Sequence, residues 1–569
     1  MSENRIDDAK LTSELATMAT VVQDPESKEQ PNIHRKLRQV ADYFELREKH
    51  HEPDVFAPTF FKNVQDLVNA IQPTSLEDLH LKCRVIGGML REANKVVKSP
   101  TNGAEYGDYK AIPPVLIKNT LKDLVEFKRI GEDNDSAAQL HVYDIDRGIY
   151  TADIWYIEKF IDVMQPGVTE RNAAEIRRWL DQDAPFHKPK NSPYITVMKN
   201  GIFDIRTRTL SGFTPTQVFT TKVDVNYNPQ AQHPHFESGW SWQQFLNDQF
   251  PAKEDKMMAW QLIQYTLMTN MPKNAYVYLY DAIGNTGKSM FANILRNLVG
   301  DRNYGTANLV QFEGQFVTAT IYDKAFIYGD ENDARYVQFN ELMKSLSTGE
   351  TITVEKKGKD GFKTRSTPMI VQSMNATPTF KNIDGGTKRR MRIIEFQHSY
   401  NGKANRAIKD YDIYNQDFLE WLAYNALNVD VTEFVDSPNS QRIKGEIERE
   451  SNPIKEYAEE RFARFKSNKI PTWMAFVDFQ VWLRKENKNT TWTKIRFTKL
   501  LRQQLLSQGW RISSGPTRIK PEDLKDDYTD FYSEYVSVAS GNMERFLPYD
   551  QEINRLKKTT NAFERVSNT

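Results

Sequence analysis

Cysteine is nearly absent from this sequence, since Cys83 is the only one among 569 residues. A single cysteine excludes an internal disulfide framework and a cysteine-rich zinc site. No run approaches the roughly 18 consecutive apolar residues of a transmembrane helix, so we expect no membrane partner. The first 30 residues also lack the apolar run of a signal peptide. These absences predict a cytoplasmic protein.

A net charge is absent too, because 76 Lys and Arg residues balance 76 Asp and Glu residues. Any contact with nucleic acid must therefore use local basic patches and not a global positive field. The apolar fraction of 39% is sufficient for several buried cores, and the length allows about three to five domains.

Hydrophobic spacing and turn residues divide the chain into four segments. Residues 1–130 begin with a polar arm and continue with helical spacing, with a loop expected at 99–109. Residues 131–240 mix strand and helix signals, and Asn200-Gly201 predicts a hairpin turn. Residues 241–452 alternate strands and helices as parallel α/β sheets do. Residues 453–569 are a further small domain, and we expect its last 30 or so residues to be loosely ordered.

The strongest motif follows a buried strand predicted at 275–280 and precedes a helix predicted at 290–299. A glycine-containing loop between a strand and a helix is the arrangement of a P-loop, whose N–H groups bind phosphate oxygens. In such a loop the lysine reaches the β- and γ-phosphates of ATP, and the hydroxyl binds Mg²⁺. Ala282 stands where the common pattern has glycine, and Gly284 is expected to supply the flexibility. The predicted ATP-binding residues are Gly284, Asn285, Thr286, Gly287, Lys288 and Ser289.

Two further predicted strands end in polar residues. Residues 325–331 end in Asp330, expected at the Mg²⁺ site with Ser289, and in Glu331, expected to activate the attacking water. The strand at 368–374 ends in Asn375, whose amide is suited to orient that water. Either end alone could be an ordinary polar turn. Together with the P-loop they favour ATP hydrolysis.

Basic residues cluster before another predicted strand, Met391–Phe396. An arginine at a subunit edge can stabilise transition-state charge on the neighbour's γ-phosphate, and Arg390 or Arg389 could serve. A solvated basic cluster, or one that binds DNA phosphates, explains the pattern about as well.

A second basic feature is the hairpin predicted at 351–364, with Lys356, Lys357 and Lys359 near its tip. Such a tip could bind a nucleic-acid backbone without sequence preference. The alternative is an exposed turn that lysines keep soluble.

The order of these motifs resembles the superfamily 3 helicases, which are AAA+ ring ATPases of viruses, phages and plasmids. The nearest likeness is the phage and plasmid primase-helicase group, which includes replication initiators of phage satellites and pathogenicity islands. The segments 197–204 and 223–231 resemble the domain that precedes the ATPase in that group. The resemblance implies an ATP- and Mg²⁺-dependent homo-hexameric helicase of a mobile element in a bacterial host, acting on single-stranded DNA and forked duplex. It favours Arg390 as the arginine finger and Lys357 as the channel lysine.

The C-terminal segment resembles a winged helix, with a wing beginning at Gly509. Its third predicted helix, 494–506, could read the major groove of origin DNA. The alternative is an amphipathic helix with a solvated basic face. The basic residues of this helix are Lys494, Arg496, Lys499 and Arg502.

The predicted fold class is therefore α/β: an AAA+ P-loop ATPase core, a helical and α+β N-terminal region, and a C-terminal winged-helix domain. The acids at 143–146 are expected to form a turn, so any primase would be a separate partner. An origin-binding scaffold with little helicase activity and another P-loop enzyme, such as a small-molecule kinase, are the rival functions.

Overall fold

The computed structural model describes most of the chain. The described residues are 30–53, 58–100, 103–134, 138–188, 192–332, 336–337, 341–358, 361–380, 385–402, 405–429, 433–451, 453–486, 492–538, 545–556 and 558–566. They divide into two compact units, of which the second comprises 334–338, 377–388 and 441–569. Within the described ranges, no helix has the length and apolarity needed to cross a bilayer.

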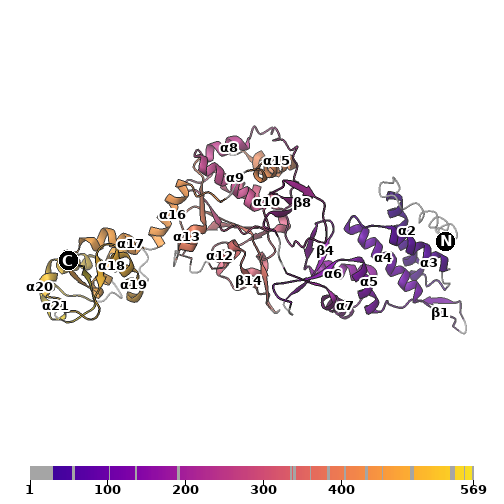
Figure 1. Ribbon diagram of the computed structural model, residues 1–569, viewed down its shortest axis with the longest axis horizontal. Helices are drawn as coiled ribbons and strands as arrows, with labels where there is room; N and C mark the ends of the chain where they lie inside the picture. Colours follow the sequence, from indigo (N-terminus) through magenta and orange to yellow (C-terminus); the bar gives the residue numbers. More distant parts are fainter. Residues whose placement is uncertain are drawn as a thin grey trace. The chain divides into compact units, whose positions relative to one another are not determined.

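The first unit begins with three helices packed on one apolar cluster (Figure 1). Leu37, Phe44 and Leu67 are nearly inaccessible within it. These helices are α2 (Gln30–Lys49), α3 (Pro58–Ala70) and α4 (Leu76–Ala93). Part of the expected loop at 99–109 is instead a strand, since β2 (Tyr106–Asp108) pairs with β1 (Val96–Lys98).

An α+β region follows, in which α5 (Pro114–Leu124) precedes a sheet of strand order β5-β4-β3-β6. The acids at 144–146 form the turn expected of them, because Asp144 Oδ1 accepts the N–H groups of Asp146 and Arg147. The predicted hairpin turn at Gly201 is confirmed by the pairing of β7 with β8. The elements are β3 (Phe127–Ile130), β4 (Gln139–Asp144), β5 (Ile149–Thr151), α6 (Ile154–Met164), α7 (Glu170–Asp183), β6 (Phe186–His187), β7 (Ile195–Met198), β8 (Gly201–Asp204) and β9 (Thr209–Ser211).

A five-stranded sheet of order β11-β12-β16-β10-β18 forms the centre of this unit, and every neighbouring pair is parallel. Every residue of β16 is buried, which explains its unbroken apolar character. Because the strands run the same way, their carboxyl ends meet at one edge. The strands are β10 (Tyr276–Tyr280), β11 (Tyr304–Thr306), β12 (Phe326–Asn332), β16 (Met369–Met374) and β18 (Met391–Glu395).

Helices before, between and after the strands share one apolar core with the sheet. Trp242 stacks on Phe291 at its centre, with ring centroids 5.8 Å apart. The larger helices of this core are α8 (Trp242–Gln249), α9 (Lys253–Leu267), α10 (Lys288–Val299) and α15 (Gln416–Leu427). Helix α12 (Glu341–Thr348) lies outside it, and α16 (Pro438–Ser451) begins in the first unit and continues into the second. Short elements complete the region: α11 (Thr318–Ile321), β14 (Thr351–Val354), β15 (Phe362–Arg365) and α14 (Arg406–Asp410). Helix α13 (Gly385–Arg390) begins in the second unit and ends in the first.

The second unit has its own apolar core and a three-stranded antiparallel sheet. The expectation of a loosely ordered end is wrong for the described residues, because β21 (Ala562–Arg565) lies between β19 (Lys469–Pro471) and β20 (Trp510–Ile512). No short wing joins β20 to β21, since two helices stand between them in the chain. The helices of this unit are α17 (Pro453–Glu456), α18 (Thr472–Lys485), α19 (Lys494–Leu506), α20 (Pro521–Val538) and α21 (Tyr549–Leu556).

Candidate active site

The loop between β10 and α10 has the conformation of a phosphate cradle. Gly284 and Gly287 have φ angles of +70° and +85°, and Asn285 also lies in the left-handed region at +52°. Ala282 keeps a negative φ, so the departure from the glycine pattern causes no strain, and Gly284 supplies the flexibility as predicted. Helix α10 begins at Lys288 with N–H groups that have no partner inside the helix, which favours an anion at this point.

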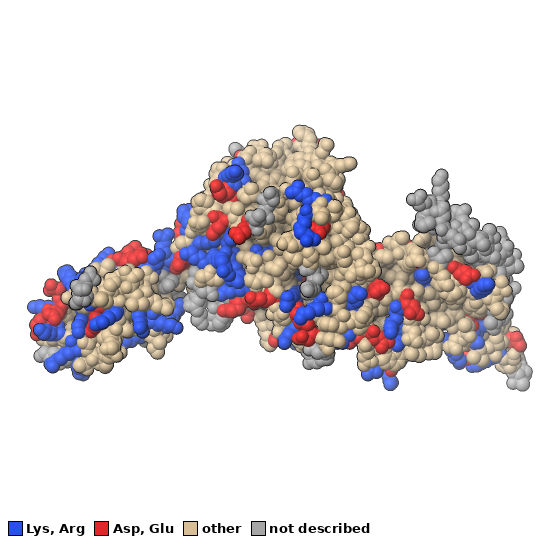
Figure 2. Space-filling view, viewed as in Figure 1, with Lys and Arg blue, Asp and Glu red and all other residues tan. Residues whose placement is uncertain are grey.

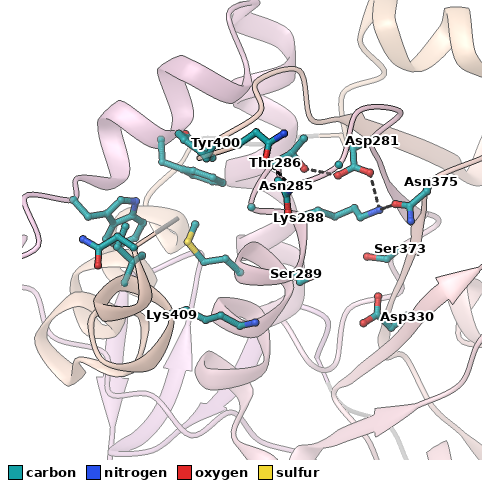
Figure 3. Close-up of a pocket in the computed structure, with 18 of the residues that line it drawn as sticks. Asp281, Asn285, Thr286, Lys288, Ser289, Asp330, Ser373, Asn375, Tyr400 and Lys409 are labelled. Atoms are coloured by element: carbon teal, nitrogen blue, oxygen red, sulfur yellow. Dashed lines mark hydrogen bonds and ion pairs between the residues drawn. The ribbon is translucent and has the colours of Figure 1, made fainter. Parts of the chain in front are cut away.

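A cavity of about 540 Å³ lies in front of the loop, a volume typical of ligand sites. Its lining brings together all the residues predicted for ATP and Mg²⁺, and also Asn375, predicted to orient the water. These are Gly284, Asn285, Thr286, Gly287, Lys288, Ser289, Asp330 and Asn375. Figure 3 shows Lys288 extended across the cavity towards Asn375, with Ser289 and Asp330 below it.

The Lys288 ammonium is buried and held by three oxygen atoms. It donates to Asp281 Oδ1 at 3.2 Å, to the carbonyl of Met374 at 2.9 Å and to Asn375 Oδ1. Asp281 Oδ2 also accepts the Thr286 hydroxyl at 2.5 Å, so one carboxylate fixes both the loop and its lysine. The sequence interpretation missed Asp281, although an acid directly after β10 was the available signal.

The end of β12 carries Asp330 out of the ladder. The pairing of β12 with β16 shifts register between Gly329 and Asn332, a bulge that changes where the intervening side chains lie. Tyr328 donates to Asp330 Oδ1 at 3.0 Å, and its oxygen lies 2.6 Å from Ser373 Oγ. Burial raises the pKa of Tyr328, so it remains a neutral hydrogen-bonding group.

The hydroxyl of Ser289 and the exposed carboxylate of Asp330 line the same cavity and are oxygen ligands of the kind Mg²⁺ prefers. Two protein ligands fit a metal that takes its remaining ligands from phosphates and water. The backbone of Glu331 follows directly in β12, while its side chain lies outside the described residues.

The opposite wall of the cavity is partly aromatic and comes from distant segments. Trp240, Met290 and Ile408 contribute apolar surface, and Tyr400 and Lys409 complete the wall. The segment around Tyr400 is bonded to the P-loop, since Tyr400 N–H donates to the Asn285 carbonyl at 2.9 Å. Apart from the phosphate cradle, the cavity therefore has room for an aromatic base.

Arg389 and Arg390 lie away from this cavity. They end α13, directly before β18, and Met391 pairs with Tyr276 at the start of β10, whereas the P-loop follows the end of β10. At about 3.3 Å per residue, the length of β10 separates these arginines from the loop of their own chain by roughly 13 Å. Figure 2 shows basic side chains gathered over this region, where Arg389 is exposed and Arg390 half-buried.

The basic hairpin forms as predicted, with Val354 opposite Phe362. Its lysines differ in position. Lys357 is exposed, whereas Lys356 folds back over the rings of Tyr322 and Phe362, 5.1 and 5.3 Å from their centroids. We had expected Lys356 to be an exposed residue at the tip, and this expectation is wrong. Lys359 lies outside the described residues.

Helix α19 buries Phe497, Leu501 and Leu505 and turns its other side to solvent. Lys494, Lys499 and Arg502 are exposed, as predicted for a basic face. Arg496 is half-buried and lies over the Trp492 ring, 4.1 Å from its centroid.

Three segments of the chain match known families. Residues 155–251 match a family described as D5 N terminal like, and residues 449–540 match one described as poxvirus D5 protein-like. Residues 279–390, which include most of the P-loop site, match a family of unknown function, DUF5906. D5-like segments thus precede and follow the P-loop in the chain, in agreement with the primase-helicase resemblance of the sequence.

Solved structures of the NrS-1 C-terminal region are also similar. One, an apo structure in its A form, is 15% identical, with 80% of this chain and 100% of that chain covered and a TM-score of 0.40. A second apo structure of the region is 14% identical, with 79% and 99% covered and a TM-score of 0.41.

Proposed function

We propose that this chain, with D5-like segments on both sides of its P-loop, is an ATP-driven DNA helicase of superfamily 3 that replicates a phage or related mobile element. The observation that carries the proposal is the meeting of Lys288, Ser289, Asp330 and Asn375 in one cavity at the carboxyl edge of a parallel sheet. A hydrolytic ATPase needs a cation for the phosphates, ligands for Mg²⁺ and a polar group near the γ-phosphate, and these residues supply all three.

The strand order supports an AAA+ core. In chain order the strands β10, β11, β12, β16 and β18 are the first to the fifth, so the sheet reads 5-1-4-3-2 from β18 to β11. A parallel sheet with the P-loop after its first strand agrees with the parallel α/β sheet that the sequence predicted for this segment, and it supports the proposed AAA+ core.

In the proposed reaction, Lys288 binds the phosphates and Asn375 orients the attacking water. Ser289 and Asp330 would hold Mg²⁺, which would supply positive charge to the β- and γ-phosphates. Glu331 accepts the proton of that water. The apolar wall around Trp240 and Ile408 holds the base, so the nucleotide is held both at its base and at its phosphates.

A ring of six chains would explain one feature of the site: among the described residues that line the cavity, none is an arginine. Arg390, or Arg389 in its place, lies at the start of β18 and is suited to reach the neighbour's nucleotide. An arginine supplied across an interface stabilises transition-state charge and couples hydrolysis to subunit movement.

We assign the hairpin β14–β15 to the channel of this ring, with exposed Lys357 as the contact to the DNA backbone. Hydrolysis at successive interfaces then draws one strand through the ring and excludes the other. The order β19-β21-β20 with helices before β20 supports a winged-helix interpretation of the second unit. The exposed face of α19 is its candidate contact with origin DNA.

The test is ATP-dependent unwinding of a forked duplex by the full chain and by Glu331→Gln, which keeps the side-chain shape but removes the proposed base. We expect the wild type to unwind, and the variant to bind ATP without unwinding. If neither protein unwinds the fork but both bind duplex DNA equally well, an origin-binding scaffold would be favoured instead. ATP hydrolysis that DNA does not stimulate would favour another P-loop enzyme.

A further inference from the structure

A second cavity, of about 360 Å³, lies in the first unit and shares no residue with the nucleotide cavity. It is bounded by β4, the start of α6, α7 and Lys356 of the basic hairpin, elements that neighbour one another in Figure 1. The D5-like match beginning at residue 155 covers α7 and most of α6.

The charges around this cavity are mostly positive. Arg177, Arg178 and Lys356 line it, against one acid, Asp181. That acid is already paired, since Arg129 Nε lies 3.3 Å from its Oδ1. Arg178 is exposed and forms no ion pair with any residue that the structure describes. An excess of cations around a cavity favours a polyanionic ligand.

The floor of the cavity is apolar. Leu140, Ile154 and Ile157 contribute to it, and Ile154 is 39% exposed. Gln139 Oε1 is buried at the rim of this floor and has no hydrogen-bond partner among the described residues. A buried acceptor without a partner is costly, and an N–H group of a ligand would satisfy it.

Helix α6, which supplies Ile154 and Ile157 to the cavity, also carries an exposed aromatic ring. Trp155 follows Ile154 in the first turn of α6 and is 70% exposed, an unusual position for so large an apolar side chain. It lies three residues before Glu158, on the same helix face, and Glu158 pairs with Arg177 of the cavity. The ring and the cations therefore belong to one surface.

We propose that this cavity and Trp155 form a second binding site for single-stranded nucleic acid. The phosphates lie along Arg177, Arg178 and Lys356, while a base stacks on Trp155 or enters the apolar floor. Cations that follow the backbone, together with an exposed aromatic ring, are how proteins bind single strands without sequence preference. The site rests on the proposed helicase function, because it extends the path of the strand outward from the Lys357 hairpin.

The test measures the affinity of the full chain for fluorescent oligo(dT) without ATP, over a range of salt concentrations. We expect Arg178→Ala to weaken binding several-fold and to lower the salt slope by about one. Trp155→Ala should weaken binding on the order of tenfold with the salt slope unchanged. Arg171→Ala is the matched control, since Arg171 is exposed on the same face of α7, two turns away and outside the cavity.

Equal affinity of Arg178→Ala and Arg171→Ala would overturn the proposal, because a diffuse surface charge would then explain the binding. Pyrophosphate binding to the wild type and to Arg178→Ala is measured as well. If the substitution weakened pyrophosphate binding but left oligonucleotide affinity intact, the proposal would also be overturned, since the cavity would then bind free phosphate. The ATPase rates of Arg178→Ala and Arg171→Ala without DNA should match that of the wild type. A wild type without ATPase would reject the helicase function and leave the binding test valid.

Discussion

The carboxylate of Asp281 should compete with ATP for the P-loop lysine, and Asp281→Asn tests this directly. In the structure all three protons of the Lys288 ammonium face protein oxygens, one of them the Asp281 carboxylate at 3.2 Å. Phosphates must take over some of these contacts when ATP binds. Asparagine keeps the acceptor for Thr286 but removes the negative charge beside the incoming phosphates.

The magnitude follows from the geometry. Opposite unit charges 3.2 Å apart attract by about 5 kcal/mol at an effective dielectric constant of about 20. The net value of a hydrogen bond to a charged group is smaller, about 1.5–3 kcal/mol. We take the lower figure, because Lys288 keeps two neutral partners, and expect Asp281→Asn to bind ATP about tenfold more tightly.

Calorimetric titration with ATP on the wild type and the variant measures the change. Asp410→Asn serves as the control, since it removes an exposed carboxylate on α14 that does not line the cavity. Weaker binding by Asp281→Asn would refute the competition and show that Asp281 orients Lys288 for the phosphates.

Three further predictions concern the subunit interface, the hairpin and pH. Mixing Arg390→Ala chains with Lys288→Ala chains should restore part of the ATPase rate that each lacks alone, because mixed rings contain interfaces with both residues; an absence of recovery would contradict an arginine acting across the interface. Lys357→Ala should weaken oligo(dT) binding several-fold and lower its salt slope by about one, and an unchanged slope would place the DNA elsewhere. Burial lowers the pKa of His141 from 6.5 to about 4. Between these values the unfolded chain binds the proton and the folded chain does not, so the free energy of unfolding should fall by about 2 kcal/mol from about pH 7 to about pH 5. Urea unfolding should show less of this loss in His141→Gln, and an equal loss would exclude His141 as its source.

The conformation of the loop between β10 and α10 could be predicted because its signals are local. A run of buried residues, two glycines and an amphipathic helix specify β10, the loop and α10 without reference to the rest of the chain. The contact of Asn375 with Lys288 is explained by one more rule, that carboxyl ends of parallel strands share an edge. Each inference needed no contact distant in sequence beyond the pairing of strands.

Asp281 was missed although its partners lie only five and seven residues away, because a polar residue after a strand also suits an ordinary turn until Lys288 and Thr286 are placed beside it. The other parts that were missed depend on contacts distant in sequence. Lys356 is drawn back by the rings of Tyr322 and Phe362, one of which lies over 30 residues away in sequence. β21 is a strand because it pairs with β19 on one side and with β20 on the other. Its four residues of mixed polarity give no local sign of this pairing.

The central place of β21 also sets the order in which the chain can fold during its synthesis. β19 and β20 are paired only through β21, so this sheet cannot close before the ribosome has released Arg565. The residues of the five-stranded sheet are made more than 160 positions earlier, ending at Glu395, and can pack while translation continues. The region around the five-stranded sheet can therefore be folded during translation while the sheet of the C-terminal unit is still open.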